Sequence, residues 1–190
     1  FAYHYLSEIK DTEDNLLKSI EAFDESINIH LTDSYNAYIT LLVNVGDAYR
    51  ELAELKNSLE YFDKAIDLYD TVLDNHSIDK NPLLYASAQN GLGVAYAKLS
   101  KIKDKELNLE KSVIALKKAL EVRTSEKHPL LYAQTMCNLG ITYTILSEIK
   151  DNKENFELAQ AHFDEALRIY TMEKREREYD RIMKYKSMLK

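Results

Sequence analysis

Two similar 22-residue segments constrain the fold of this chain more than any other feature of its sequence. "LLYASAQNGLGVAYAKLSKIKD" begins at Leu83, and "LLYAQTMCNLGITYTILSEIKD" begins at Leu130, 47 residues later. The same interval separates Gly46, Gly93 and Gly140. Self-similarity with a period of roughly 20–50 residues is typical of solenoids, in which each unit packs on its neighbours. The sequence therefore predicts a stack of repeated units.

Each unit has the pattern of a helical hairpin. Leu92, Tyr96 and Leu99 lie three or four residues apart, which is the spacing of one face of an α-helix. A second amphipathic run follows, such as "NLEKSVIALKKALEV" or "ENFELAQAHFDEALRIY". Pro82 and Pro129 suit the first turn of a helix, where the missing N–H is not needed. We therefore predict an all-α solenoid of antiparallel helix hairpins.

The second helices align on large apolar residues at Phe23, Phe62, Leu116 and Phe163. In this alignment the interval from Gly46 to Phe62 is seven residues shorter than the interval in the later units. Seven residues form roughly two helical turns. We expect the longer hairpins to gain about one turn in each helix, with "SEIKD" ending the first helix.

The predicted organisation is a single repeat domain over residues 1–190. Its units span about 1–31 (partial), 35–73, 82–123 and 129–171, and a closing helix covers 174–189. The chain begins "FAYHYL" without Met, so we expect it to be a fragment of a longer protein.

The paired motifs Leu-Gly-x-x-Tyr and Ala-x-x-x-Phe-x-x-Ala resemble the tetratricopeptide repeat. The best match is Gly46–Ala65, and Ala159, Phe163 and Ala166 give the second motif again. The period of about 47 residues exceeds the family's usual length of about 34, which indicates a long-helix variant. The resemblance implies a right-handed superhelix whose first helices line a concave groove. It also implies a protein-interaction scaffold that binds a partner's peptide or helix there.

Helical phase indicates which first-helix side chains face that groove, because they point away from the partner helices. The candidates are Thr40, Val43, Asn44, Asp47, Arg50, Ser87, Asn90, Val94, Lys98, Gln134, Asn138, Ile141 and Ile145. The asparagines can bond a peptide backbone or simply face water. Val94, Ile141 and Ile145 are either covered by a ligand or closed off by neighbouring helices. The Lys and Asn pair of the family's chaperone-tail clamp is absent.

The sequence offers little for catalysis. It contains no Gly-rich phosphate loop and no His-Glu-x-x-His motif, and its histidines are scattered. We therefore expect no enzymatic activity, no catalytic residues, no cofactor and no metal site. His76 is expected to be solvated in a loop. The single cysteine, Cys137, suits a reducing cytoplasm. The net charge of −7 argues against nucleic acid, and no apolar run reaches the roughly 20 residues of a membrane span.

Two alternatives to a peptide-binding scaffold stay open. The chain can be a segment of a self-assembling repeat array, forming a homo-oligomer through its truncated N-terminal repeat. It can also be the regulatory or sensor arm of a larger signalling protein or enzyme.

Overall fold

The computed structural model describes residues 12–30, 35–150 and 153–188, and all regular structure in these ranges is α-helical. The helices are α2 (Thr12–His30), α3 (Tyr35–Lys56), α4 (Leu59–Asn75), α5 (Pro82–Leu99), α6 (Lys105–Leu120), α7 (Pro129–Lys150), α8 (Lys153–Met172) and α9 (Glu176–Met188). The first helix predicted for the partial repeat, residues 1–10, lies outside the described residues.

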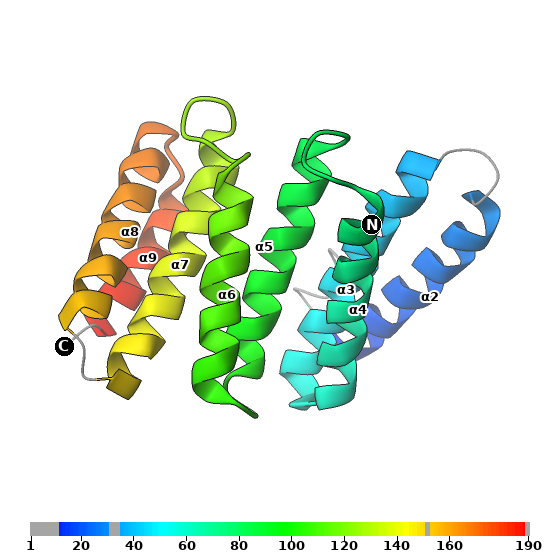
Figure 1. Ribbon diagram of the computed structural model, residues 1–190, viewed down its shortest axis with the longest axis horizontal. Helices are drawn as coiled ribbons and strands as arrows, with labels where there is room; N and C mark the ends of the chain where they lie inside the picture. Colours follow the sequence, from blue (N-terminus) through cyan, green and yellow to red (C-terminus); the bar gives the residue numbers. More distant parts are fainter. Residues whose placement is uncertain (1–11, 31–34, 151–152, 189–190) are drawn as a thin grey trace.

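The helices follow one another along the long axis of the molecule, from α2 at one end to α8 and α9 at the other (Figure 1). Each helix packs on the next along the chain, and α5 also contacts α3 and α7. The helices α3, α5, α7 and α9 begin at residues 35, 82, 129 and 176, so they start at intervals of 47 residues. The predicted all-α solenoid of helix hairpins is therefore confirmed.

The alignment of the second helices was wrong by seven residues in the hairpin of α3 and α4. A Cβ on Gly140 would lie 2.6 Å from Phe163, and a Cβ on Gly93 would lie 2.5 Å from Leu116. The corresponding contact of Gly46 is with Tyr69, at 2.8 Å, and not with Phe62. Tyr69 is therefore the counterpart of Leu116 and Phe163, and all three pairs have the same spacing in the chain.

The predicted extra turn in each later hairpin is wrong for the same reason. The helices α4, α6 and α8 begin 24, 23 and 24 residues after the starts of α3, α5 and α7, so the hairpin of α3 and α4 is not two turns shorter than the later ones. The two described copies of the "IKD" motif also differ from each other. Ser147–Lys150 continue α7, whereas 101–103 form a turn after α5.

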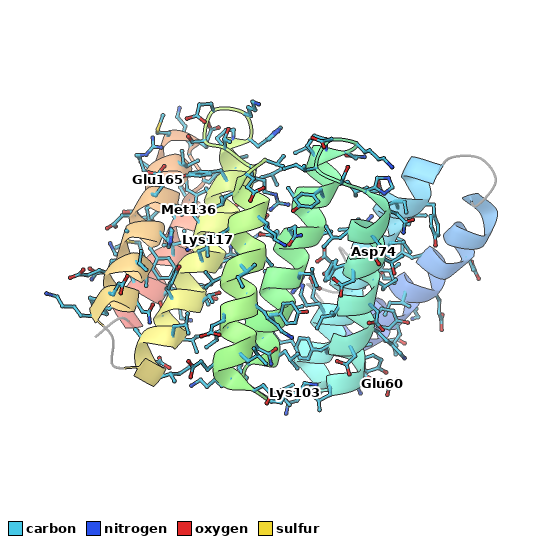
Figure 2. All side chains as sticks on the ribbon, viewed as in Figure 1. Glu60, Asp74, Lys103, Lys117, Met136 and Glu165 are labelled. Atoms are coloured by element: carbon cyan, nitrogen blue, oxygen red, sulfur yellow. The ribbon has the colours of Figure 1, made fainter. Side chains whose placement is uncertain are left out.

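The apolar core consists mainly of two clusters, each built around rings from the second helices. Phe62 and Tyr69 of α4 fill the space between α3 and α5. Phe163 of α8 packs with Leu139 of α7 and Ile182 of α9. Each fully buried side chain of this size contributes roughly 1.5–3 kcal/mol. Charged side chains such as Glu60 of α4 and Lys117 of α6 stay exposed (Figure 2).

The connection between α4 and α5 contains a helix cap and a buried side chain. Asn81 caps α5 by accepting a hydrogen bond from the backbone N–H of Leu84 at 3.3 Å. His76, expected to face solvent, is only 4% exposed after the end of α4, so that prediction is wrong. Within the described ranges, no helix combines the length and the apolar character needed to cross a bilayer.

Candidate functional site: a polar cavity between the first helices

A cavity of about 360 Å³ lies between the first helices of successive hairpins. It is lined by Val43, Asn44, Asp47 and Arg50 of α3, Ser87, Asn90, Gly91 and Val94 of α5, Gln134 and Asn138 of α7, Arg181 of α9, and Arg123 after α6. Most of these side chains are polar. Their guanidinium groups outnumber their carboxylates by three to one, which gives the cavity an excess of positive charge.

Nine of the thirteen predicted groove residues line this one cavity. The remaining four are Thr40, Lys98, Ile141 and Ile145. Thr40 is exposed, and Lys98 forms an ion pair with Glu54 of α3. Ile141 and Ile145 are half-buried and pack against the core of α7 and α8, so neighbouring helices close them off. Their apolar character is thus explained without a ligand.

Tyr69 contacts the walls of the cavity because two glycines make room for its ring. A Cβ on Gly46 would lie 2.8 Å from the ring of Tyr69, and a Cβ on Gly91 would lie 2.5 Å from it. The hydroxyl of Tyr69 donates to Asp47 Oδ1 at 2.7 Å. Burial, reinforced by the Asp47 carboxylate, raises the pKa of Tyr69 well above its usual value, so the hydroxyl stays protonated. Gly91 and Tyr69 therefore connect α4 to the first-helix layer.

The charges on α3 are already partly neutralised. Arg50 Nη2 donates to Asp47 Oδ1 at 3.3 Å and to Glu51 Oε1 at 3.4 Å. Asp47 Oδ1 thus accepts from both Tyr69 and Arg50. The Nε of Arg50 and the Nδ2 of Asn44 are buried and have no hydrogen-bond partner among the described residues. Two residues of α3 that line this cavity therefore each carry an unsatisfied donor.

The opposite wall is a hydrogen-bonded contact between α5 and α7. Asn138 Nδ2 donates to Asn90 Oδ1 at 3.1 Å, and the hydroxyl of Thr135 lies 3.1 Å from the same oxygen. Thr135 is fully buried. These bonds hold the two asparagines in place and leave further amide donors and acceptors available at the cavity.

Arg123 is the lining residue that sequence reasoning missed most clearly. It is only 4% exposed, three residues after the end of α6. Its Nη1 donates to Thr135 Oγ1 at 3.1 Å and lies 3.4 Å from Gln134 Oε1, and its Nη2 donates to Ser87 Oγ at 3.2 Å. All these acceptors are neutral. Its Nε is buried with no partner. Helical phase could not find Arg123, because the residue belongs to a loop.

Burial lowers the pKa of Arg123 to about 10, although the negative charge of Asp47 acts in the opposite direction. Arg123 therefore remains positively charged at neutral pH. Its hydrogen-bond acceptors are all neutral, so only the more distant charge of Asp47 offsets its own, which is costly for a buried ion. Arg181, also missed, adds a second cation from α9.

Comparison with known families gives a match for the hairpin of α3 and α4, which carries Tyr69 and forms the α3 wall of this cavity. Residues 39–71, which cover most of α3 and α4, match the tetratricopeptide repeat. The hairpin of α3 and α4 therefore contains a tetratricopeptide repeat. Searches of curated proteins and of solved structures found no significant match. Tetratricopeptide repeats generally mediate protein–protein interactions, and the family is typically a non-catalytic scaffold.

The match also explains why the sequence favoured an alignment of the second helices on Phe62. Ser58, Phe62 and Ala65 have the spacing of the tetratricopeptide motif and lie inside the matched region. In the structure, Ser58 only precedes α4, and its side chain forms no capping bond. Phe62 is fully buried in the core, but Tyr69 contacts the glycine. The motif thus identifies the family without giving the internal packing of the hairpin.

Two other features of the structure do not extend the site. Among the described residues, no three His, Cys, Asp or Glu side chains gather in the manner of metal ligands. A larger hollow of about 760 Å³ lies between α2 and α3, but its lining begins at Thr12, directly after the undescribed residues 1–11. The polar cavity is therefore the better-defined candidate site.

Proposed function

We propose that this chain binds an extended peptide or a helix of a partner protein in the groove formed by α3, α5 and α7. The observation that carries the proposal is the cavity that spans these three successive first helices. Its volume of about 360 Å³ falls in the usual range for ligand pockets, roughly 300–1,000 Å³. Because it crosses several repeats, one ligand segment would contact several hairpins at once.

The chemistry of the lining suits a peptide main chain. Asn44, Asn90 and Asn138 offer both amide donors and carbonyl acceptors, and a peptide backbone needs both. Val43 and Val94 add small apolar surfaces between them. The cysteine, Cys137, is free and buried, which fits a reducing compartment, so we infer that binding takes place in the cytoplasm.

The test selects peptides from displayed linear and helical libraries and measures their affinity for two tryptophan variants. Gln134→Trp places a large ring at the cavity from an exposed position on α7. Lys117→Trp makes the matched change on the exposed side of α6 (Figure 2). We expect the selected peptides to bind Gln134→Trp at least tenfold more weakly than the unmodified protein, and Lys117→Trp with unchanged affinity.

Two results would contradict the proposal. One is a set of selected peptides that bind Gln134→Trp as tightly as the unmodified protein. The other is a library screen that yields no binder from either format. Circular dichroism of both variants must match the unmodified protein, so that a loss of binding reports the cavity and not unfolding.

A further inference from the structure

The unsatisfied donors of the cavity point to the chemistry of its ligand. The buried side-chain atoms without a partner in the described residues include Asn44 Nδ2, Arg50 Nε and Arg123 Nε, and all three belong to residues that line this cavity. Buried polar groups without partners are rare in folded proteins, and each costs about 1–3 kcal/mol. Three residues that line one cavity thus each carry an unsatisfied N–H donor, which is consistent with a ligand that supplies acceptors there.

The charge balance shows what kind of acceptor fits. Arg50 has Asp47 and Glu51 as ion-pair partners. Arg123 has only the neutral oxygens of Ser87, Thr135 and Gln134 within hydrogen-bond distance. The carboxylate of Asp47 already accepts bonds from Tyr69 and Arg50. Arg123 is therefore a buried cation, 4% exposed, to which the described residues offer no carboxylate bond.

A purely structural role accounts for only part of Arg123. Its bonds to Ser87 and Thr135 fix the loop after α6 against α5 and α7. These bonds use Nη1 and Nη2 and leave the Nε–H edge unused. Oxyanions bind arginine through bonds of this kind, often to two of its nitrogens at once.

We propose that the cavity binds an oxyanion group, a carboxylate or a phosphate, through the guanidinium group of Arg123, with Asn44 and Arg50 as neighbouring donors. This inference deepens the proposed function, since the oxyanion would be carried by the bound partner segment. It names acidic or phosphorylated peptides as the ligand class. Arg181, which lines the same cavity from α9, adds to the positive charge that would attract such a segment.

The experiment titrates the isotope-labelled protein with small probes and follows its arginine Nε–H and asparagine side-chain NMR signals at constant ionic strength. Sodium acetate tests the carboxylate, inorganic phosphate tests the phosphate, and acetamide serves as the neutral counterpart of acetate. We expect saturable shifts of the Arg123 Nε–H and Asn44 Nδ2 signals with acetate, phosphate or both, and none with acetamide. Acetate and phosphate thereby distinguish the two sources of the oxyanion.

Two variants provide the control. Arg123→Met should weaken the binding seen at Asn44 by roughly tenfold or more, a loss expected for one charge-assisted bond. Arg168→Met removes an exposed arginine of α8 that pairs with Glu165, and it should leave binding unchanged. If Arg123→Met does not fold, the titration of the unmodified protein remains decisive. Unchanged Arg123 and Asn44 signals with both anions would overturn the proposal.

The anion titration and the peptide selection can fail separately. Anion binding without any peptide that depends on Gln134 would retain the oxyanion site and reject the peptide groove. Selected peptides that depend on Gln134 but contain no acidic or phosphorylated residue would reject the oxyanion site and retain the groove.

Discussion

At the scale of single residues, the contacts of three glycines organise the hairpins. Gly46, Gly93 and Gly140 each lie against a large side chain of the second helix, at distances that leave no room for a Cβ. Glycine within a helix costs roughly 0.5–1 kcal/mol relative to alanine. That cost is smaller than the packing it permits, because the opposing side chains are fully buried.

Gly140→Ala should therefore destabilise the protein although alanine favours helix. The added Cβ would lie 2.6 Å from Phe163, whose ring is fully buried and cannot move without disturbing its neighbours. Overpacking of this kind costs about 1–3 kcal/mol, so we expect a net loss of roughly 1–2 kcal/mol in the free energy of unfolding. Urea denaturation measures the change. Lys117→Ala, on an exposed surface, is the control, and a stabilised Gly140→Ala would contradict this account.

Cys137 should be unreactive in the folded protein. Burial raises the pKa of its thiol to about 11. The unfolded thiol titrates near 8.5, so at pH 8 folding lowers the thiolate fraction by roughly two orders of magnitude. The associated stability is complete below about pH 8.5 and is lost as the pH rises towards 11. Ellman's reagent should react at least about 100-fold more slowly without urea than with it. Since Cys137 is the only cysteine, fast labelling of the folded chain would refute the prediction.

The cavity shows which residues could be predicted from the sequence and which could not. Asn44, Asn90 and Asn138 follow from helical phase relative to a repeated glycine, so the sequence sufficed to bring them together. The contact of Tyr69 with Gly46 could not be predicted, because Phe62 has the spacing of the family motif and was therefore aligned with Leu116 and Phe163. Arg123 could not be found by phase, since a loop has no period that fixes the direction of a side chain.

At the scale of helices, the residues at which they begin were easier to predict than the residues at which they end. Pro82 and Pro129 fix the first turns of α5 and α7, and both helices begin there. The ends depend on tertiary packing, so the related segments after Gly93 and Gly140 end their helices at different points, Leu99 and Lys150. Similar residues thus form a turn in one hairpin and continued helix in another.

The two candidate caps should differ in their contribution to stability. Asn81 accepts a bond from Leu84 N–H at the start of α5, whereas the Ser58 side chain makes no capping bond at the start of α4. We expect Asn81→Ala to cost about 1 kcal/mol, within the usual range of about 0.5–2 kcal/mol. Ser58→Ala should cost a few tenths of that amount. Thermal unfolding of both variants compares them, and equal losses would show that the capping bond is unimportant.

At the scale of the whole molecule, each hairpin is stabilised by its contacts with the neighbouring hairpins. The helix α5 packs against α3, α4, α6 and α7. Towards the described ends, α2 packs on α3 and α9 packs on α8, with fewer neighbours each. In solenoids, stability is approximately a sum of repeat and interface contributions, so repeats with fewer interfaces open more readily.

Amide hydrogen exchange should therefore vary along the solenoid. We expect fast exchange in α2 and α9, and slow exchange in α5 and α7, whose amides are released only by opening of the central repeats. Mass spectrometry of peptides from each helix measures the order. Equal protection from α2 to α9 would mean that the chain opens as one cooperative unit.

The position of Arg123 shows that helix packing and the charge at the cavity depend on different parts of the chain. The rings and glycines that hold the hairpins together lie on the helices, whereas the cation at the cavity lies in a linker between hairpins. In the preceding linker, the residue 47 positions earlier is His76, which is also buried. A substitution of Arg123 would therefore change the charge at the cavity without altering the glycines and rings that hold the hairpins together.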